Sequence, residues 1–553
     1  MGTESDNADQ KSEPGPSGVD SASAAEEGTP DLQSGLRIIS RLPLNNPQLA
    51  ESELDRLLDN LLQNPPPASV YLNLLEQMRM PLHLVEEERA RHYVHKPLPL
   101  GDDEESCFQQ VIATWSKVAR TYAHCLKLDT SPDSIEHTFR DAQILHRCLH
   151  YAGLVIVEHQ RARRELPHGV WLGLHAYFTQ AEKKGVATLS IPDSLDPLGR
   201  STHCTAAYVS LLLSEQASPY SLSIRDQTLV RRWASNWAPL VSLHAVVPGE
   251  PLPAYVVDLT QDVGLCASSD SLQTEQLRRL DTSHLSLQLG QIRKQLNQKM
   301  APSQTGLGED CTAGQCKRLL AHLSTPWSQA QAPRKFRRHA TTGIAKVCLG
   351  FDEMHYYISG KEFSQQDQNH TYSRQAFENL FAFPLMDDPA QQLQMRQQQL
   401  GFTVDQWEVV NQSATGFRLM RRIVGKKIAH GQLLAICPHD GVNFLLAHVT
   451  WLMQEQGGGL IAGIAALPGI PQAVAARPIG QDATHNELYR RAFILPAVPT
   501  IGAEQSLVIP QGWYRAGRLF EIFSDTARRV KLLHVLDDGP DFERVSFVEA
   551  TST

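Results

Sequence analysis

The sequence lacks the short motifs that reveal nucleotide chemistry most directly, and it lacks a convincing membrane segment. It contains no GxxxxGK[ST] loop and no GxGxxG loop, so neither P-loop hydrolysis nor dinucleotide binding is predicted. The best membrane candidate is the charge-free run at residues 457–476, but this run is rich in glycine and contains Pro468 and Pro471. A membrane-spanning helix needs more large apolar residues. We therefore expect a strand followed by a loop there, and no integral membrane segment.

Disulfide frameworks and excess positive charge are also missing. The nine cysteines are an odd number without framework spacing, which is typical of a protein in a reducing cytoplasm. The N-terminus is polar and acidic, without the basic and apolar regions of a signal peptide. These features predict a cytoplasmic protein. The formal net charge of −9 argues against nucleic acid as a partner, although a local basic pocket for a small anion is compatible with it. Candidates for such a pocket include Arg421, Arg422, Lys426 and Lys427.

No cluster of histidine, cysteine or acidic residues has the spacing of a metal site or a catalytic site. Helical geometry places His146 and His150 on one face and Cys148 off that face. Cys311 and Cys316 lack the second pair that a zinc site needs. We therefore predict no metal site, no cofactor and no catalytic residue, and we expect that the protein is not an enzyme.

Composition and periodicity divide the chain into regions. Residues 1–36 are rich in serine, glycine, proline and acids, which predicts a disordered acidic tail. From about residue 40 to residue 325, apolar residues recur at three- and four-residue spacing, as at 144–156, which predicts a mostly helical domain. Residues 480–553 contain short strand-like runs, which predict a small β extension or a second barrel.

Two motifs stand out in the C-terminal half. The first has the form RxxxR and contains Arg334, Arg337 and Arg338. The second has the form [D/N]xSxxG and contains Asn411, Ser413 and Gly416, between two runs of strand-like composition. A turn of small polar residues between two strands is a plausible position for residues that face a ligand.

These residue types suit a ligand that carries guanine bases and phosphates. The planar fork of arginine can bond O6 and N7 of guanine, grip a phosphate or stack on a base. Asparagine supplies an amide donor and a carbonyl acceptor for a guanine edge, and serine adds a hydroxyl. Glycine lets the backbone approach a planar ligand closely.

In this order, the two motifs resemble the signature of the PilZ family, which are bacterial receptors for the second messenger cyclic di-GMP. The strand–Gly–strand succession after Gly416 is similar to the rest of a PilZ β-barrel, and the resemblance covers about residues 330–475. It implies a cyclic di-GMP site formed by Arg334, Arg337, Arg338, Asn411, Ser413 and Gly416. There is no recognisable GGDEF or EAL sequence, so we expect that the chain neither makes nor breaks the messenger.

The chain departs from the family in one respect. Arg338 and Asn411 lie much farther apart than is usual in the family, which we interpret as an insertion around residues 361–402. The sequence at 372–400 is compatible with helix and ends in a glutamine-rich run. The expected fold class is multidomain α+β: a mostly α-helical N-terminal domain, a PilZ-like antiparallel β-barrel and a further small β unit.

The predicted function is that of a cyclic di-GMP-binding signalling effector, which acts on an unidentified protein partner through its helical domain. Ligand binding would order the arginine segment and reset the barrel against the helical domain. The alternative is a ligand-free helical scaffold or chaperone-like adaptor with a degenerate PilZ barrel. The complete motifs favour the receptor, whereas the insertion favours the scaffold.

Overall fold

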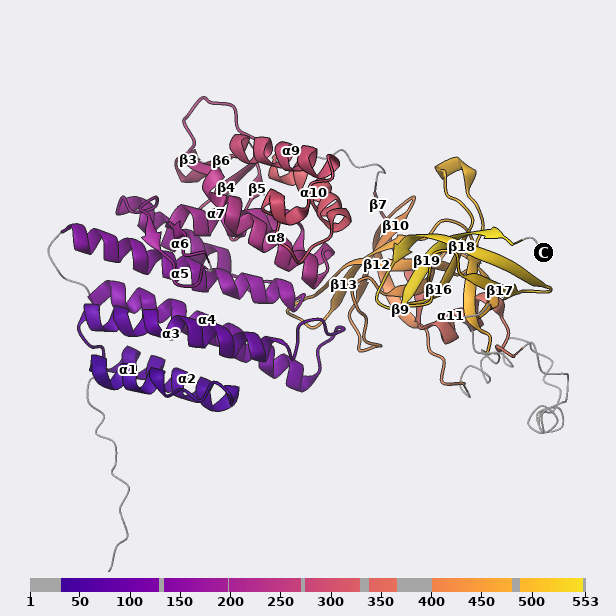
Figure 1. The fold of residues 1–553 in the computed structure, drawn as a ribbon, viewed down its shortest axis with the longest axis horizontal. Helices are drawn as coiled ribbons and strands as arrows, with labels where there is room; N and C mark the ends of the chain where they lie inside the picture. Colours follow the sequence, from indigo (N-terminus) through magenta and orange to yellow (C-terminus); the bar gives the residue numbers. More distant parts are fainter. Residues whose placement is uncertain are drawn as a thin grey trace, which may run out of the picture.

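The computed structural model describes residues 31–128, 134–196, 198–269, 274–328, 338–365, 400–479 and 488–550. Helices stack approximately in chain order in the N-terminal part, and two neighbouring β units follow (Figure 1). The expected fold class, a multidomain α+β protein with a helical N-terminal domain and antiparallel barrels, is confirmed. Among the described helices, none is both long enough and apolar enough to cross a membrane.

The first half of the helical domain consists of α1 (Leu32–Ser40), α2 (Pro47–Gln63), α3 (Ala68–Ala90), α4 (Asp102–Leu128), α5 (Ile135–Arg161) and α6 (Val170–Lys183). Local signals set several helix starts, because the side chains of Asn46 and Ser134 accept backbone N–H bonds at the beginnings of α2 and α5. The periodic stripe of α5 faces the core, where Leu145, Leu149 and Ile156 are buried.

Helix α1 begins inside the segment 1–36 for which composition predicts a disordered tail. The carboxylate of Asp31 caps this helix by accepting the backbone N–H of Ser34 at 2.6 Å. Leu32 and Leu36 pack against the core formed by α2 to α5. The prediction is therefore wrong for the residues within α1, because two leucines give the helix an apolar face. Residues 1–30 lie outside the described residues.

The second half of the helical domain consists of α7 (Cys204–Gln216), α8 (Ile224–Trp237), α9 (Ser283–Asn297) and α10 (Ala313–Trp327). They pack with an antiparallel sheet in the order β3-β6-β4-β5, formed by β3 (Ser242–Ala245), β4 (Tyr255–Asp258), β5 (Cys266–Ala267) and β6 (Leu277–Asp281). A short hairpin pairs β1 (Ile191–Pro192) with β2 (Ser201–Thr202). The indole of Trp327 donates to the carbonyl of Leu213 at 2.8 Å, which ties the end of α10 to α7.

The middle β unit is an antiparallel barrel. Its strands are β7 (His339–Ala340), β8 (Ile344–Leu349), β9 (Asp405–Ser413), β10 (Gly416–Arg421), β11 (Leu433–Cys437), β12 (Leu445–Gln454) and β13 (Leu460–Ala466). The order is β10-β13-β12-β11-β8-β9, and the pairing of β9 with β10 closes the ring. Strand β7 pairs with β9 beyond the end of β8. Alternate residues such as Val409, Leu419 and Leu452 point inward and form the barrel core.

The C-terminal β unit is a second closed barrel, in the order β14-β15-β16-β19-β18-β17. Its strands are β14 (Gln472–Ile479), β15 (Arg490–Leu495), β16 (Ser506–Pro510), β17 (Leu519–Phe523), β18 (Ala527–Asp538) and β19 (Phe542–Glu549). The charge-free run at 457–476 forms β13, a turn and the first residues of β14. The expected strand is therefore present, and the chain returns to strand sooner than the sequence suggests.

Helix α11 (Phe351–Ser359) follows β8 and packs between the two barrels. Met354 is fully buried there, in one cluster with Leu433 of the middle barrel and Phe493 of the C-terminal barrel. Most of the expected insertion at 361–402, including its helix-compatible part up to residue 399, lies outside the described residues. That prediction stays a prediction.

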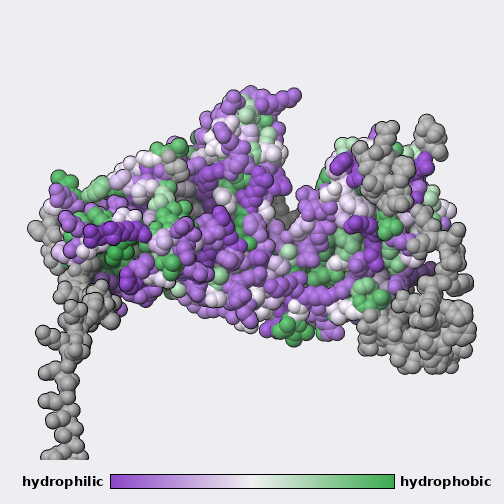
Figure 2. Space-filling view, turned by 60° about the horizontal axis from the view of Figure 1, so that its bottom comes forward, coloured by the Kyte–Doolittle hydropathy of each residue, from purple (hydrophilic) through white to green (hydrophobic). Residues whose placement is uncertain are grey.

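The helical domain is hydrogen-bonded to the middle barrel at narrow contacts. Leu98 and Ile428 exchange backbone bonds of 2.8 Å in both directions. Gln454, at the end of β12, donates its backbone N–H to the carbonyl of Arg163 at 2.8 Å and accepts that of Glu165 at 2.9 Å. Figure 2 shows a notch between the helical and barrel lobes, and on this face the hydrophobic residues lie in small separated patches. Such patches are ordinary for a protein surface.

The contact at His430 should make stability depend on pH. Burial, with a smaller contribution from the Arg163 guanidinium, lowers the pKa of His430 to about 4, and its Nε2 lies 3.2 Å from the carbonyl of Ser221. An unfolded histidine has a pKa of about 6.5. The unfolded chain therefore binds this proton more readily than the folded chain does. The contribution of His430 to the free energy of unfolding is fully present above pH 6.5 and is lost as the pH falls toward 4. We expect the urea midpoint to drop more between pH 7 and pH 5 in the wild type than in His430→Gln. Equal drops would contradict this assignment.

Candidate ligand-binding face

The [D/N]xSxxG motif forms the hairpin between β9 and β10. Asn411 and Ser413 lie in β9, and Gly416 is the first residue of β10, opposite Ser413. The Ser413 hydroxyl donates to the carbonyl of Gly416 at 3.4 Å. A Cβ atom at Gly416 would lie 2.6 Å from the backbone carbonyl oxygen of Ile464 in β13. Glycine at this position therefore lets β10 pair closely with β13.

Gly416→Ala is expected to destabilise the middle barrel by about 1–3 kcal/mol, because the added methyl group meets backbone rather than a flexible side chain. Gly457→Ala, in the turn between β12 and β13, is the matched control, since nothing lies within 4 Å of a Cβ at that position. Thermal unfolding followed by circular dichroism compares the two variants. Equal unfolding midpoints would show that close strand pairing does not require glycine at 416.

Strand register places Asn411 in a row of residues that crosses the barrel surface. The row runs through β7, β9, β10, β13 and β12 and consists of Ala340, Asn411, Arg418, Gly463 and Trp451. Directly paired residues on neighbouring strands project to the same face. In the chain, Leu419 follows Arg418, Ala462 precedes Gly463 and Leu452 follows Trp451. These three neighbours belong to the barrel core, so the row itself faces outward.

Arg418 and Trp451 form a flat platform in this row. The guanidinium carbon of Arg418 lies 5.6 Å from a ring centroid of Trp451, which is a cation–π distance. A Cβ atom at Gly463, which pairs with both residues, would overlap the indole of Trp451. The glycine therefore leaves the space that the indole occupies. A guanidinium plane beside an indole offers two surfaces on which a base can stack.

The sequence motifs point to neither residue of this platform. Strand alternation could have indicated Arg418, because it lies two residues after Gly416 and projects to the same face of β10. No local signal connects Trp451 to the motif. Its position follows from the β12–β13 register, which shifts at a bulge between Val449 and Trp451.

Two buried polar atoms of the row have no hydrogen-bond partner among the described residues. They are Oδ1 of Asn411, an acceptor, and Nε of Arg418, a donor. The two residues are direct partners in the β9–β10 register, so the unpaired atoms belong to adjacent side chains. Buried polar atoms in folded proteins nearly always have a partner. These two atoms mark the row as a place where a ligand can complete the hydrogen bonding.

The structure describes one arginine of the RxxxR motif, Arg338, whereas Arg334 and Arg337 lie outside the described residues. Arg338 is exposed and immediately precedes β7, whose two residues pair with Gln412 and Asn411. Residues two apart in an extended chain project to the same face. The pairing therefore brings Arg338 to the motif strand, on the side of Asn411.

The basic residues at the end of β10 and just after it form ion pairs within the protein. Each of them pairs with a carboxylate: Arg421 with Asp405 at 2.5 Å, Arg422 with Glu408 at 3.5 Å, Lys427 with Glu104 at 3.2 Å, and Lys426 with Glu353. Arg421 is the last residue of β10, and the other three follow it in the chain, at the end of the strand opposite Gly416. These ion pairs match the positive charges with carboxylates from other elements, and the contribution of the four residues to a basic ligand pocket stays a prediction.

The side-chain types of the row suit binding and stacking rather than catalysis. The row offers an amide, a guanidinium, an indole and a glycine backbone, and it contains no carboxylate, imidazole or thiol. Such a set supplies neither a nucleophile nor a general base. Within the part of the chain that the structure describes, no group of three or more His, Cys, Asp or Glu residues can hold a metal ion.

Comparison with known proteins finds three family models along the chain. The model of the N-terminal domain of the cyclic-di-GMP receptor FimW matches residues 33–249, and that of its middle PilZ domain matches residues 255–384. The model of the FimW C-terminal beta-barrel domain matches residues 474–550. The middle match ends before Asn411, so the positions of the [D/N]xSxxG residues rest on the motif and on the barrel geometry.

A curated relative extends over most of the chain. The cyclic-di-GMP receptor FimW of Pseudomonas aeruginosa is 22% identical over 524 residues, which cover 88% of this chain and 84% of the relative. The similarity therefore includes the helical domain and both barrels, rather than the PilZ signature alone.

Proposed function

Because this chain belongs to the PilZ-domain family and carries a large helical domain ahead of its barrels, we propose that it is a cyclic di-GMP-binding signalling effector. Its helical domain acts on a protein partner when the messenger binds. The protein works in the cytoplasm as a receptor and not as an enzyme. The similarity to a cyclic-di-GMP receptor over 88% of the chain supports the receptor role. The nine cysteines, which are all free, support the cytoplasmic location.

The proposed site combines both motifs with the platform. Arg334 and Arg338 clamp the guanines and phosphates of the ligand, and Arg337 adds positive charge to the same segment. Asn411 and Ser413 bond a guanine edge, and Gly416 permits close approach. These roles agree with the types of the residues, and for Asn411 with its position on the outward row.

The observation that carries the proposal is the unpaired Oδ1 of Asn411 beside the unpaired Nε of Arg418. Guanine presents N–H donors on one edge and the acceptors O6 and N7 on another. A single base can therefore satisfy both atoms. The neighbouring indole of Trp451 gives the base a surface for stacking, worth about 1–3 kcal/mol per base in comparable sites. A degenerate barrel without ligand would leave both atoms unpaired at a cost.

Strand β12 links the proposed site to the helical domain. Trp451 lies in this strand, and the same strand ends at Gln454. Besides its two backbone bonds to the end of α5, Gln454 accepts a bond from the Arg164 side chain at 3.1 Å, and only 7% of its surface is exposed. A ligand that moves Trp451 therefore acts on a strand hydrogen-bonded to the helical domain, and this link supports a protein-interaction output.

Hydrogen–deuterium exchange of the full chain, with and without cyclic di-GMP, tests this function. We expect slower exchange in β9 and β10, where the ligand binds, and a change at the contact of β12 with the end of α5. GTP should cause neither. Exchange that is unchanged by a saturating concentration of cyclic di-GMP would contradict the proposal. A change limited to β9 and β10 would support ligand binding but contradict the transfer of the signal through β12 to the helical domain.

A further inference from the structure

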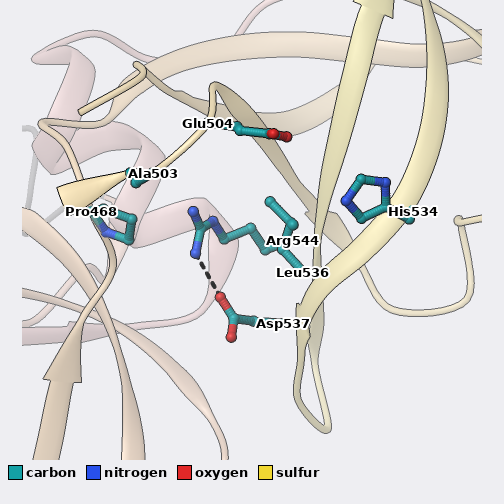
Figure 3. A pocket seen from close by; sticks show the side chains of 8 residues that line it. Pro468, Ala503, Glu504, His534, Leu536, Asp537 and Arg544 are labelled. Atoms are coloured by element: carbon teal, nitrogen blue, oxygen red, sulfur yellow. Dashed lines mark hydrogen bonds and ion pairs between the residues drawn. The ribbon is translucent and has the colours of Figure 1, made fainter. Parts of the chain in front are cut away.

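A pocket of about 400 Å³ lies beside the turn that joins the two barrels, and its lining contains none of the residues of the ligand-binding face. Its wall includes Pro468 from this turn, Glu504 from the loop before β16, His534 and Asp537 from β18, and Arg544 from β19 (Figure 3). Its size suits a small ligand rather than a macromolecule. No role proposed above uses these residues.

Arg544 is held rigidly in this pocket. Only 7% of its surface is exposed. Its Nε donates to the hydroxyl of Ser506 at 2.9 Å, and its Nη1 donates to Asp537 at 2.6 Å. A guanidinium has five N–H groups. Within the described residues, Arg544 makes the two hydrogen bonds just given, so its other N–H groups are not bonded to these residues. In Figure 3 the guanidinium lies between Pro468 and His534, and its one dashed contact among the residues drawn goes to Asp537.

Glu504 supplies the opposite chemistry on the same pocket. It is exposed, and it forms no ion pair within the part of the chain that the structure describes. Figure 3 shows its carboxylate extending along the pocket, apart from the Arg544 guanidinium. The ring of His534 is held by a bond of 3.0 Å between its Nδ1 and the hydroxyl of Ser546. The pocket therefore presents hydrogen-bond donors on one side and an unpaired acceptor on another, beside a fixed imidazole ring.

We propose that this pocket binds a guanine base. Guanine carries the acceptors O6 and N7 on one edge, which match the free N–H groups of Arg544, and N–H donors on the adjoining edge, which match the Glu504 carboxylate. Adenine places an N6 amino donor where guanine has O6, so it would oppose the arginine. Pro468 and His534 offer flat surfaces at the sides of the base. This site uses residues other than those of the ligand-binding face and does not depend on the function proposed for that face.

Calorimetric titration of the full chain with guanosine 5′-monophosphate tests the proposal. The titrations use the Arg418→Ala/Trp451→Ala background, so that the ligand-binding face does not contribute. We expect the monophosphate to bind at least tenfold more tightly than adenosine 5′-monophosphate does. Glu504→Gln should weaken its binding at least tenfold. Glu549→Gln is the matched control, because Glu549 is an exposed carboxylate of the same barrel, with a side chain that is 74% exposed.

Three outcomes would overturn the proposal: no binding of guanosine monophosphate, equal binding of the two monophosphates, or equal effects of the two glutamate substitutions. Tighter binding of a zwitterionic amino acid such as glycine, sensitive to Glu504→Gln, would also overturn it, because the pocket would then recognise carboxylate and ammonium groups. Guanosine monophosphate binding that depends on Glu504 in a protein that does not bind cyclic di-GMP would support this site and contradict only the function of the other face.

Discussion

The double substitution Arg334→Ala/Arg338→Ala is expected to weaken cyclic di-GMP binding by about 10²- to 10⁴-fold. Each arginine is assigned charge-assisted contacts to guanine or phosphate, and the loss of one such contact costs about 1.5–3 kcal/mol. Each single substitution should therefore weaken binding roughly 10- to 100-fold, and the two effects add if the contacts are independent. Isothermal titration calorimetry measures the dissociation constants of the single and double variants.

The matched control removes two exposed arginines of the helical domain. Arg56 and Arg91 are exposed, with side chains that are 71% and 69% exposed, and each pairs with a glutamate three residues earlier in the chain. Arg56→Ala/Arg91→Ala changes the net charge equally and should leave the affinity within twofold of the wild type. Wild-type affinity in the Arg334→Ala/Arg338→Ala variant would remove both residues from the site, and an equal loss in the control would reduce their role to general charge attraction.

The second large effect is expected at the platform. Trp451→Ala should weaken cyclic di-GMP binding by about 5- to 150-fold, because stacking of a base on an aromatic ring contributes about 1–3 kcal/mol. Trp451→Phe should retain most of the affinity, since it keeps an aromatic surface. Arg418→Ala should also weaken binding, because it removes the donor that lies next to Asn411. Competition of the variants against a fluorescent cyclic di-GMP analogue measures these differences.

The C-terminal barrel offers a matched control for the platform. There the guanidinium carbon of Arg490 lies 5.7 Å from the ring centroid of Trp513, close to the 5.6 Å between Arg418 and Trp451. Trp513→Ala removes the same chemistry from a different surface and should not change cyclic di-GMP affinity. If Trp451→Ala and Trp513→Ala bind equally well while both proteins remain folded, the platform is not part of the site.

The sequence predicts the fold class because its signals are local. Three- and four-residue periodicity indicates the helical domain, and β-branched and aromatic runs indicate the strands on both sides of the [D/N]xSxxG motif. The motif itself is a contiguous hairpin, so its residues are found in one place by reading the chain. Helix α1 is not predicted because it begins inside a segment of polar and acidic composition, and the burial of its apolar residues depends on packing against α2 to α5.

Residues brought together by strand register could not be predicted in the same way. Arg418 and Trp451 meet because β13 lies between β10 and β12 and because bulges shift the pairing. Lys427 belongs to a basic run in the sequence, and its partner is likewise set by the fold. In the folded protein Lys427 lies 3.2 Å from Glu104 of the helical domain, a partner that no local pattern indicates. The positive charge of this basic run is therefore matched by a carboxylate in the folded protein, which the sequence alone does not indicate.

Calorimetric titration of the purified full chain with cyclic di-GMP tests the central claim most directly. GTP and cyclic di-AMP are the controls, since one shares the base and the other shares the cyclic dinucleotide backbone. The account predicts saturable binding of cyclic di-GMP, micromolar or tighter, and at least a hundredfold weaker binding of both controls. Absence of binding by well-folded protein, or equal affinity for cyclic di-AMP, would contradict the claim that this barrel is a cyclic di-GMP receptor.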